Sequence, residues 1–136
     1  MRIKAVPIKE LKLDQNNARS HDDENLTAIA RSLKRFGQQK PIVVNQEGVV
    51  IAGNGTLEAA TALGWSKLAV VQTDLEADEQ TLYAIADNRT GDLASWNLPQ
   101  LDLVLRSLDF DTLGDLGFDE MAMDEILPQP DEEDFE

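Results

Sequence analysis

The sequence predicts a small α/β domain with a mixed sheet and packed helices, followed by a helical extension and an acidic tail. Short β-branched segments bounded by Gly, Pro and polar residues alternate with segments in which apolar residues recur at helical spacing. The 136 residues suit one compact domain with a real core. The order expected from these segments is β-α-β-β-α-β and then further helices.

The first third of the chain predicts one strand and one amphipathic helix. A short strand is expected near Ala5–Ile8, followed by a polar connection. A helix of about residues 23–36 begins where Asp22 or Asp23 can cap it, and Gly37 ends it. Its apolar residues share one face and are Leu26, Ile29, Ala30, Leu33 and Phe36.

The middle of the chain predicts a hairpin, a helix and another strand. The two hairpin strands read PIVVN and VVIAG, with QEG as the turn between them. A helix over about residues 55–63 ends at Gly64, and the segment KLAVVQTD is the next strand. Trp65 and Trp96 are both expected to anchor the core rather than to stack on bases.

The rest of the chain predicts helices. One helix runs from about Asp78 to Asn88, with Leu82, Ile85 and Ala86 on its apolar side. The segment RTGDLASWNLP is expected to break it before a helix of about residues 98–107. Beyond that point the sequence reads as short acidic segments and a low-complexity end. The expected division is a domain over 1–108 and a tail over 109–136.

Charge is distributed unevenly along the chain, whose net formal charge is −14. Residues 109–136 hold twelve Asp and Glu and no Lys or Arg, whereas residues 1–40 hold nine bases and five acids. A surface that binds DNA independently of sequence is far more basic. We therefore expect weak or no direct DNA binding by this chain alone.

Two other properties of the composition bound the function. The chain has no cysteine, which excludes disulfides, thiolate metal sites and a cysteine nucleophile. It has no long apolar run, and its first residues lack the apolar core of a signal peptide. The expectation is a cytoplasmic protein without a membrane segment.

His21 is the single histidine, so it is expected to be solvated or to cap a helix rather than to bind a metal.

The segment IAGNGT leads from a buried strand into a helix within a few residues. Gly53 and Gly55 permit positive φ and a close backbone approach, and the N–H groups of a helix N-terminus attract anions. Thr56 adds a hydroxyl donor. The alternative is an ordinary turn in which Asn54 caps the helix. The segment is neither a Walker loop nor G-x-G-x-x-G, so both interpretations stay open.

Two more segments bear on that choice. In FGQQKP, polar side chains stand at the mouth of the strand beside the glycine loop, where they could face a ligand; they are Gln38 and Gln39. In IADNRTGD, a carboxylate, an amide and a guanidinium follow one another at the expected end of a helix, at Asp87, Asn88 and Arg89. Such groups suit a hydrated Mg²⁺ and its phosphates.

Together these segments resemble the ParB/sulfiredoxin superfamily, specifically the ParB N-terminal-like domain. The resemblance rests on the succession VPIKEL, NNARSH, LTAIARSLKRFG, FGQQKPIVV, VVIAGNGTLEAATALG and IADNRTGDLASW, and it covers roughly residues 3–108. The chain looks most like the phage and prophage branch, whose members are often joined to or encoded near DNA methyltransferases. A cytoplasmic protein encoded by a bacterium or a phage is implied, and a homodimer is compatible with it.

The resemblance implies a site for CTP, or another nucleoside triphosphate, with Mg²⁺. The implied nucleotide pocket includes the segment from Gly37 to Pro41 with Gln38 and Gln39. The implied phosphate loop corresponds to Gly53, Asn54, Gly55, Thr56, Leu57, Glu58 and Ala59. The implied metal ligands are Asp87 and Asn88. Arg19 stands where the family commonly has an arginine, and Arg89 could add a further cation.

The chain also departs from the family pattern. Gly55 and Thr56 replace both arginines of the phosphate motif, and Asn54 stands where sulfiredoxin has its essential cysteine, so sulfiredoxin activity is excluded. The acidic C-terminal residues cannot form the helix-turn-helix DNA reader that follows the nucleotide domain in the family.

Three functions follow. The first is a nucleotide-binding module that acts with DNA-associated machinery such as partition or DNA modification. The second is an enzyme, either a nuclease or one that hydrolyses or transfers the phosphates of nucleoside triphosphates, with Glu58 and Asp87 as catalytic candidates. The third is a degenerate scaffold that binds a protein partner through its acidic tail. The first is the function that we expect.

Overall fold

The computed structural model of the chain describes residues 1–17, 20–108 and 110–118. The chain divides into two compact units between Ala94 and Ser95. The expected boundary after residue 108 stays a prediction. Arg19 and residues 119–136, which hold most of the expected tail, lie outside the described residues.

The first unit contains a four-stranded mixed sheet, as predicted. Its strands are β1 (Ile3–Pro7), β2 (Ile42–Val44), β3 (Val50–Ala52) and β4 (Lys67–Gln72), in the order β1-β4-β2-β3. β1 and β4 are antiparallel, β2 and β4 are parallel, and β2 and β3 form the expected antiparallel hairpin. β1 begins two residues earlier than expected, at Ile3, and it ends at Pro7 because Ile8 belongs to a 3-10 helix, η1 (Ile8–Glu10).

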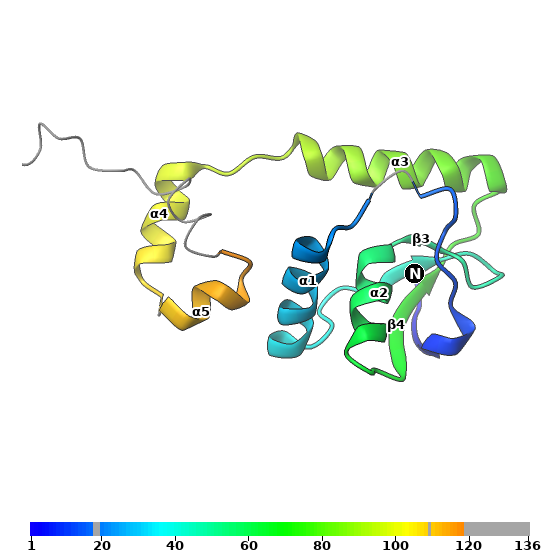
Figure 1. The fold of residues 1–136 in the computed structure, drawn as a ribbon. Coiled ribbons are helices and arrows are strands. Elements are labelled where there is room, and N and C mark those ends of the chain that lie inside the picture. Colours follow the sequence, from blue (N-terminus) through cyan, green and yellow to red (C-terminus); the bar gives the residue numbers. More distant parts are fainter. Residues whose placement is uncertain (18–19, 109, 119–136) are drawn as a thin grey trace, which may run out of the picture. The chain divides into compact units, whose positions relative to one another are not determined.

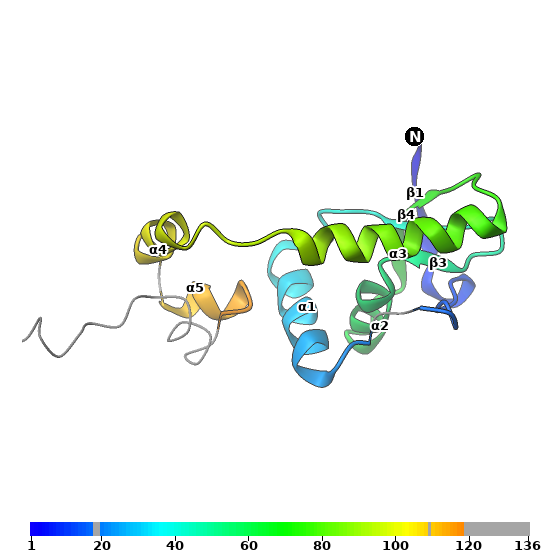
Figure 2. The same ribbon diagram turned by 90° about the horizontal axis from the view of Figure 1, so that it is seen from above.

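Three helices accompany this sheet. They are α1 (Asp23–Phe36), α2 (Asn54–Ala62) and α3 (Ala77–Leu93). α1 and α2 pack against each other (Figure 1), and α3 packs against β3. Figure 2 shows α3 from above, lying across this end of the unit next to β3. α2 begins directly after β3, with Gly53 as the single residue between Ala52 and Asn54.

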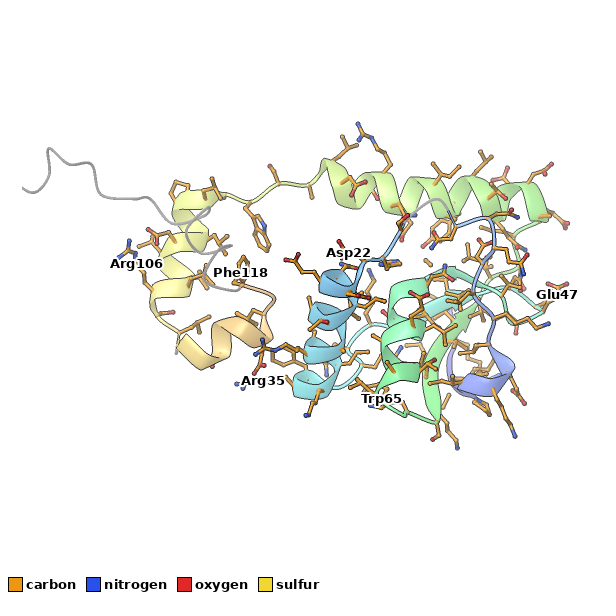
Figure 3. All side chains as sticks on the ribbon, in the orientation of Figure 1. Asp22, Arg35, Glu47, Trp65, Arg106 and Phe118 are labelled. Carbon is orange, nitrogen blue, oxygen red and sulfur yellow. The ribbon has the colours of Figure 1, made fainter. Side chains whose placement is uncertain are left out.

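The core lies between the sheet and helices α1 and α2. Leu68, Val50 and Val70 are its largest fully buried side chains, and α2 adds Leu57. Trp65 is partly buried and packs against this cluster, as expected (Figure 3). Burying one Leu or Val side chain contributes about 1.5–3 kcal/mol. β3, which carries the fully buried Val50, leads directly into the glycine loop.

The predicted bounds of α1 are confirmed by both of its caps. The side chain of Asp22 accepts a hydrogen bond from the N–H of Asn25 at 2.7 Å, and Figure 3 shows Asp22 at this end of the helix. At the other end Gly37 has φ 74°, and its N–H donates to the carbonyl of Leu33 at 2.8 Å. Glycine adopts this left-handed conformation without steric cost.

The prediction for α3 was wrong in two respects. The helix does not stop at Asn88 but continues to Leu93, because a single Gly91 costs only about 1 kcal/mol relative to Ala and no proline intervenes. Its apolar side chains are also exposed: Leu82 by 60% and Ile85 by 53%. The expected break in the helix therefore begins only at Ala94.

The second unit is helical, with α4 (Leu98–Arg106) and α5 (Phe110–Asp115). Leu105 is buried, and Arg106 Nε pairs with Asp102 Oδ1 at 2.7 Å. The rings of Trp96 and Phe118 lie 5.9 Å apart between centroids, and Figure 3 labels Phe118 and Arg106. Trp96 remains 62% exposed, so the expectation that it anchors a core was wrong.

Across the described part of the chain, none of the helices combines the length and the apolar character needed to cross a membrane.

Candidate functional site

The glycine loop is built around Gly53, which precedes the first residue of α2. Its φ is 110°, a value that side-chain-bearing residues rarely adopt, and an added Cβ would lie 2.4 Å from Ile42 Cγ2. Both the backbone conformation and the neighbouring strand thus require glycine. Among the described residues, no side chain caps the N-terminus of α2. Its first N–H groups can therefore donate to an anion.

Asn54 ties the loop to the rest of the unit. It is only 7% exposed. Its Oδ1 accepts from the N–H of Asp14 at 2.9 Å, and its Nδ2 donates to the carbonyl of Val50 at 3.1 Å. The alternative in which Asn54 caps the helix is therefore wrong, because its amide holds the loop before α1 against β3. What Asn54 can offer a phosphate is its backbone N–H.

Gly55 lets α1 approach α2. An added Cβ at Gly55 would lie 2.7 Å from His21 Cε1 and 2.8 Å from Ile29 Cδ1. The imidazole of His21 thus occupies the space that a side chain at Gly55 would need. Its Nδ1 lies 2.5 Å from Oδ1 of Asn25. The sequence led us to expect a solvated or helix-capping His21, and its contact with Gly55 could not be foreseen because it depends on how α1 packs on α2.

In the segment between α1 and β2, the polar side chains form hydrogen bonds with backbone groups. Gln38 pairs with both backbone groups of Ala69: its Oε1 accepts from the N–H at 2.7 Å and its Nε2 donates to the carbonyl at 2.9 Å. Gln39 Nε2 donates to the carbonyl of Phe36 at 2.6 Å. β2 runs parallel to β4, and Ile42 pairs with Val70. The two hydrogen bonds of Gln38 to Ala69 therefore extend this pairing by one residue toward the N-terminal end of β4. A ligand role for either glutamine stays a prediction.

The residues expected to hold the metal lie within α3 and not at its end. Asp87 and Asn88 are partly buried and Arg89 is exposed. Successive residues are turned about 100° around a helix, so the side chains of Asp87 and Asn88 leave α3 in different directions. The described residues contain no group of three or more His, Cys, Asp or Glu placed to hold a metal. A Mg²⁺ ion here would take its other oxygens from water and phosphate.

Thr56 and Glu58 complete the first turns of α2, and both are partly buried. Glu58 is the only ionisable side chain of this helix and stands one turn after Gly55. Thr56 lies in the first turn, where a hydroxyl can add to the backbone donors. The expected roles of Thr56 as a phosphate ligand and of Glu58 as a catalytic candidate stay predictions.

A separate cavity of about 720 Å³ lies beside the loop and not at it. Lys12, Asp14, Ile51 and Gln80 are among the residues that line it, from the segment before α1, from β3 and from the first turns of α3. None of the described residues predicted for the site lines this cavity. The loop, rather than this cavity, is the candidate anion site, because the loop presents the uncapped N–H groups of α2. Asp14 connects the two places, since its backbone N–H donates to Asn54.

Comparison with known proteins places this geometry in a family. Residues 1–89 match the ParB N-terminal domain. The ParB-like nuclease domain-containing protein YnaK of Escherichia coli (strain K12) is 32% identical over 80 residues, which are 59% of this chain and 92% of YnaK. The nucleoid occlusion protein of Halalkalibacterium halodurans is 30% identical over 90 residues, or 63% of this chain. The chain spans only 32% of the length of that second protein.

Solved structures show the same fold at low sequence identity. The C-terminally truncated chromosome-partitioning protein ParB of Caulobacter crescentus, complexed with CTP-γ-S, has a TM-score of 0.75 at 19% identity, covering 86% of this chain and 72% of that one. Sulfiredoxin from Arabidopsis thaliana has a TM-score of 0.51 at 19% identity, covering 62% of this chain and 98% of that one. The ParB/sulfiredoxin fold predicted from the sequence is confirmed, and the chain belongs to the ParB N-terminal domain family.

Proposed function

We propose that this chain is a nucleotide-binding module that holds CTP with Mg²⁺ and acts with DNA-associated machinery for partition or DNA modification. The observation that carries the proposal is the uncapped N-terminus of α2 behind Gly53. A helix of nine residues directs its first N–H groups and the positive end of its dipole toward an anion. The ParB structure with a TM-score of 0.75 is a complex with a CTP analogue, which supports the same ligand class.

In this proposal the phosphates lie on the backbone of Gly53, Asn54, Gly55 and Thr56. Asp87 and Asn88 hold the Mg²⁺ ion that shields the phosphate charge, and Arg89 adds a cation from the exposed side of α3. Arg19 is proposed as a further cation. Gly37 and Pro41 shape the wall against the base, since Gly37 ends α1 and Pro41 directly precedes β2.

A thermal unfolding screen tests this proposal. The four ribonucleoside triphosphates are added singly, with and without Mg²⁺, to the wild-type chain and to Asp87→Ala. A ligand at a hundredfold above its Kd stabilises the folded state by about 2.7 kcal/mol. We expect a rise in Tm of several degrees with CTP and Mg²⁺, lost in Asp87→Ala. Unchanged Tm values with every nucleotide would contradict the proposal.

A nuclease is the second candidate, favoured by the likeness to YnaK, whose name describes a ParB-like nuclease domain. Glu58 and Asp87 are the carboxylates that would then act with a metal ion on a phosphodiester. The test is incubation of supercoiled and single-stranded DNA with the chain in Mg²⁺ or Mn²⁺. Cleavage that is lost in Glu58→Gln or Asp87→Asn would favour an enzyme over a binding module.

A degenerate scaffold is the third candidate, and the packing at Gly55 favours it. The space that the family's arginine would need is filled by His21 and Ile29. Such a module would bind a basic protein, for example a DNA methyltransferase encoded by the same phage or prophage, through its residues 109–136. Retention of a purified partner by the full chain, but not by one truncated after Leu108, would support this role.

A further inference from the structure

We propose that Asn54 is a site of spontaneous deamidation, and that the reaction rate is set by how often Asp14 releases the side-chain amide of Asn54. The inference goes beyond the proposed function and does not depend on it, because the reaction needs no ligand. Of the asparagines in the chain, only Asn54 is followed by a glycine, Gly55. Asparagine is a thermolabile residue, and a glycine after it leaves the next backbone nitrogen unhindered by a side chain.

The reaction takes place within the chain and needs only water. The backbone nitrogen of Gly55 gives up its proton and attacks Cγ of Asn54, which closes a succinimide ring through a new N–C bond. The bond from Cγ to Nδ2 breaks, and Nδ2 leaves as ammonia with the proton. Water then opens the ring at either of its carbonyls, which yields aspartate or isoaspartate in place of Asn54. No atom is oxidised or reduced.

The fold opposes this reaction at two points. Asn54 is the first residue of α2, and the ring cannot form while its backbone keeps the ψ of a helix. Its side chain is only 7% exposed, and both ends of the amide are hydrogen-bonded: Oδ1 to the N–H of Asp14 and Nδ2 to the carbonyl of Val50. Cγ can therefore turn toward the nitrogen of Gly55 only after these bonds open.

The two partners of the amide differ in how firmly the fold holds them. Val50 belongs to β3 and is fully buried. Asp14 lies outside any helix or strand, and its neighbours Leu13 and Gln15 are exposed. Exposed segments of irregular structure open locally at a fraction of the free energy of global unfolding. The release of Asn54 therefore begins with the departure of Asp14.

The start of α2 resists the reaction little once Asp14 has left. Gly53 and Gly55 flank Asn54, and glycine has the greatest backbone freedom of all residues. Among the described residues, no side chain caps this helix. The N–H of Gly55 lies in the first turn, where a backbone N–H has no acceptor within the helix. The attacking nitrogen is thus not held by a helical hydrogen bond.

The products change the loop. A carboxylate only accepts hydrogen bonds, so an oxygen in place of Nδ2 would face the carbonyl of Val50 without a hydrogen between them. Isoaspartate also lengthens the backbone in the first turn of α2. Both products place a negative charge beside Gly53, which repels anions. Deamidation is therefore expected to destabilise α2 and to weaken any binding of phosphate.

The experiment is incubation of the full chain at mildly alkaline pH, followed by digestion and mass spectrometry of the peptide that contains Asn54. The folded chain is compared with the same chain in guanidinium chloride and with Asp14→Pro, because proline has no N–H to donate to Asn54. Gln38→Ala is the matched control, since it loses two hydrogen bonds elsewhere in the same unit.

We expect Asn54 in the folded chain to react about ten- to a hundredfold more slowly than in the unfolded chain, because its amide must first leave two buried hydrogen bonds. The rate should rise roughly tenfold in Asp14→Pro, since one of the two bonds is then absent. Gln38→Ala should react at the wild-type rate.

Three results would overturn the inference. One is an equal rate at Asn54 in the folded and the unfolded chain. Another is no product in the folded chain after an incubation about a hundred times longer than the unfolded chain needs. The third is equal acceleration in Asp14→Pro and Gln38→Ala, which would show that unfolding of the whole unit controls the reaction.

A second variant covers the case in which Asp14→Pro does not fold. Asp14→Ala removes the carboxylate that accepts from the N–H of Asn16 and so loosens the same segment, while the N–H at position 14 remains. We expect Asn54 to react faster in Asp14→Ala than in Gln38→Ala. Equal rates in these two variants would overturn the inference.

Discussion

The residues proposed for the nucleotide site fall into two sets, and these two sets use their polar side chains in opposite ways. In the first set, the amide oxygen and the amide nitrogen of both Asn54 and Gln38 are hydrogen-bonded to backbone groups. On α3, the exposed Arg89 and the partly buried Asp87 lie along a helix whose apolar side chains are also exposed. The first set therefore determines the shape of the loop, and we propose that the second set supplies the side-chain chemistry. Substitutions in the first should change stability, and those in the second should change binding.

The largest effect on stability is expected at Gly53. Replacement by Ala forces a side chain into φ 110° and within 2.4 Å of Ile42. Left-handed strain of about 1–2 kcal/mol and overpacking of about 1–3 kcal/mol should lower the free energy of unfolding by about 3 kcal/mol. The matched control is Gly64→Ala, with φ 79° and no described atom within 4 Å, which should lose only the strain. Equal losses in urea unfolding would disprove the contact with Ile42.

The next effect is expected at Asn54. Asn54→Ala leaves the N–H of Asp14 and the carbonyl of Val50 without their partners in the interior. An unsatisfied buried group costs about 1–3 kcal/mol, so a loss of about 3 kcal/mol is expected. Gln46→Ala, at an exposed position of the hairpin turn, should change stability by less than about 0.5 kcal/mol. A wild-type unfolding midpoint for Asn54→Ala would show that the amide does not hold the loop.

A smaller loss is expected at Gln38. Gln38→Ala removes two hydrogen bonds to Ala69, worth about 1–2 kcal/mol together. Gln39→Ala removes one exposed hydrogen bond to Phe36 and should cost less than about 1 kcal/mol. Amide hydrogen exchange at Ala69 provides a local readout. It should accelerate in Gln38→Ala and stay unchanged in Gln39→Ala; the reverse order would contradict the assignment of Gln38 to the β4 ladder.

The smallest effect on stability is expected on α3. Asp87→Ala and Arg89→Ala remove charges from a largely exposed helix and should change the free energy of unfolding by less than about 0.5 kcal/mol. Both should weaken nucleotide binding, and Asp87→Ala should also abolish the requirement for Mg²⁺. Ligand-free unfolding curves and CTP titrations with and without the metal separate the two quantities. A large loss of stability without ligand would show that Asp87 stabilises the fold rather than binding the ligand.

Much of the fold could be predicted because its signals are local. Asp22 and Gly37 bound α1 through contacts within four residues, and both are visible in the sequence. The role of Asn54 could not be predicted, because its partner Asp14 lies 40 residues away. The contact of His21 with Gly55 could not be predicted for a related reason, since it depends on how α1 packs on α2. The end of α3 was misplaced because Thr, Gly and Asp form helices weakly and yet do not forbid one.

The central claim is that the N-terminus of α2 is a nucleotide site served by α3. Its most direct test is titration of CTP with Mg²⁺ into the wild-type chain, Asp87→Ala and Gln46→Ala at one pH. The account predicts binding to the wild type and Gln46→Ala and a loss of at least tenfold in affinity for Asp87→Ala, with all three proteins equally stable. Equal affinity in all three would contradict the role of α3, and no binding to the wild type would contradict the site itself.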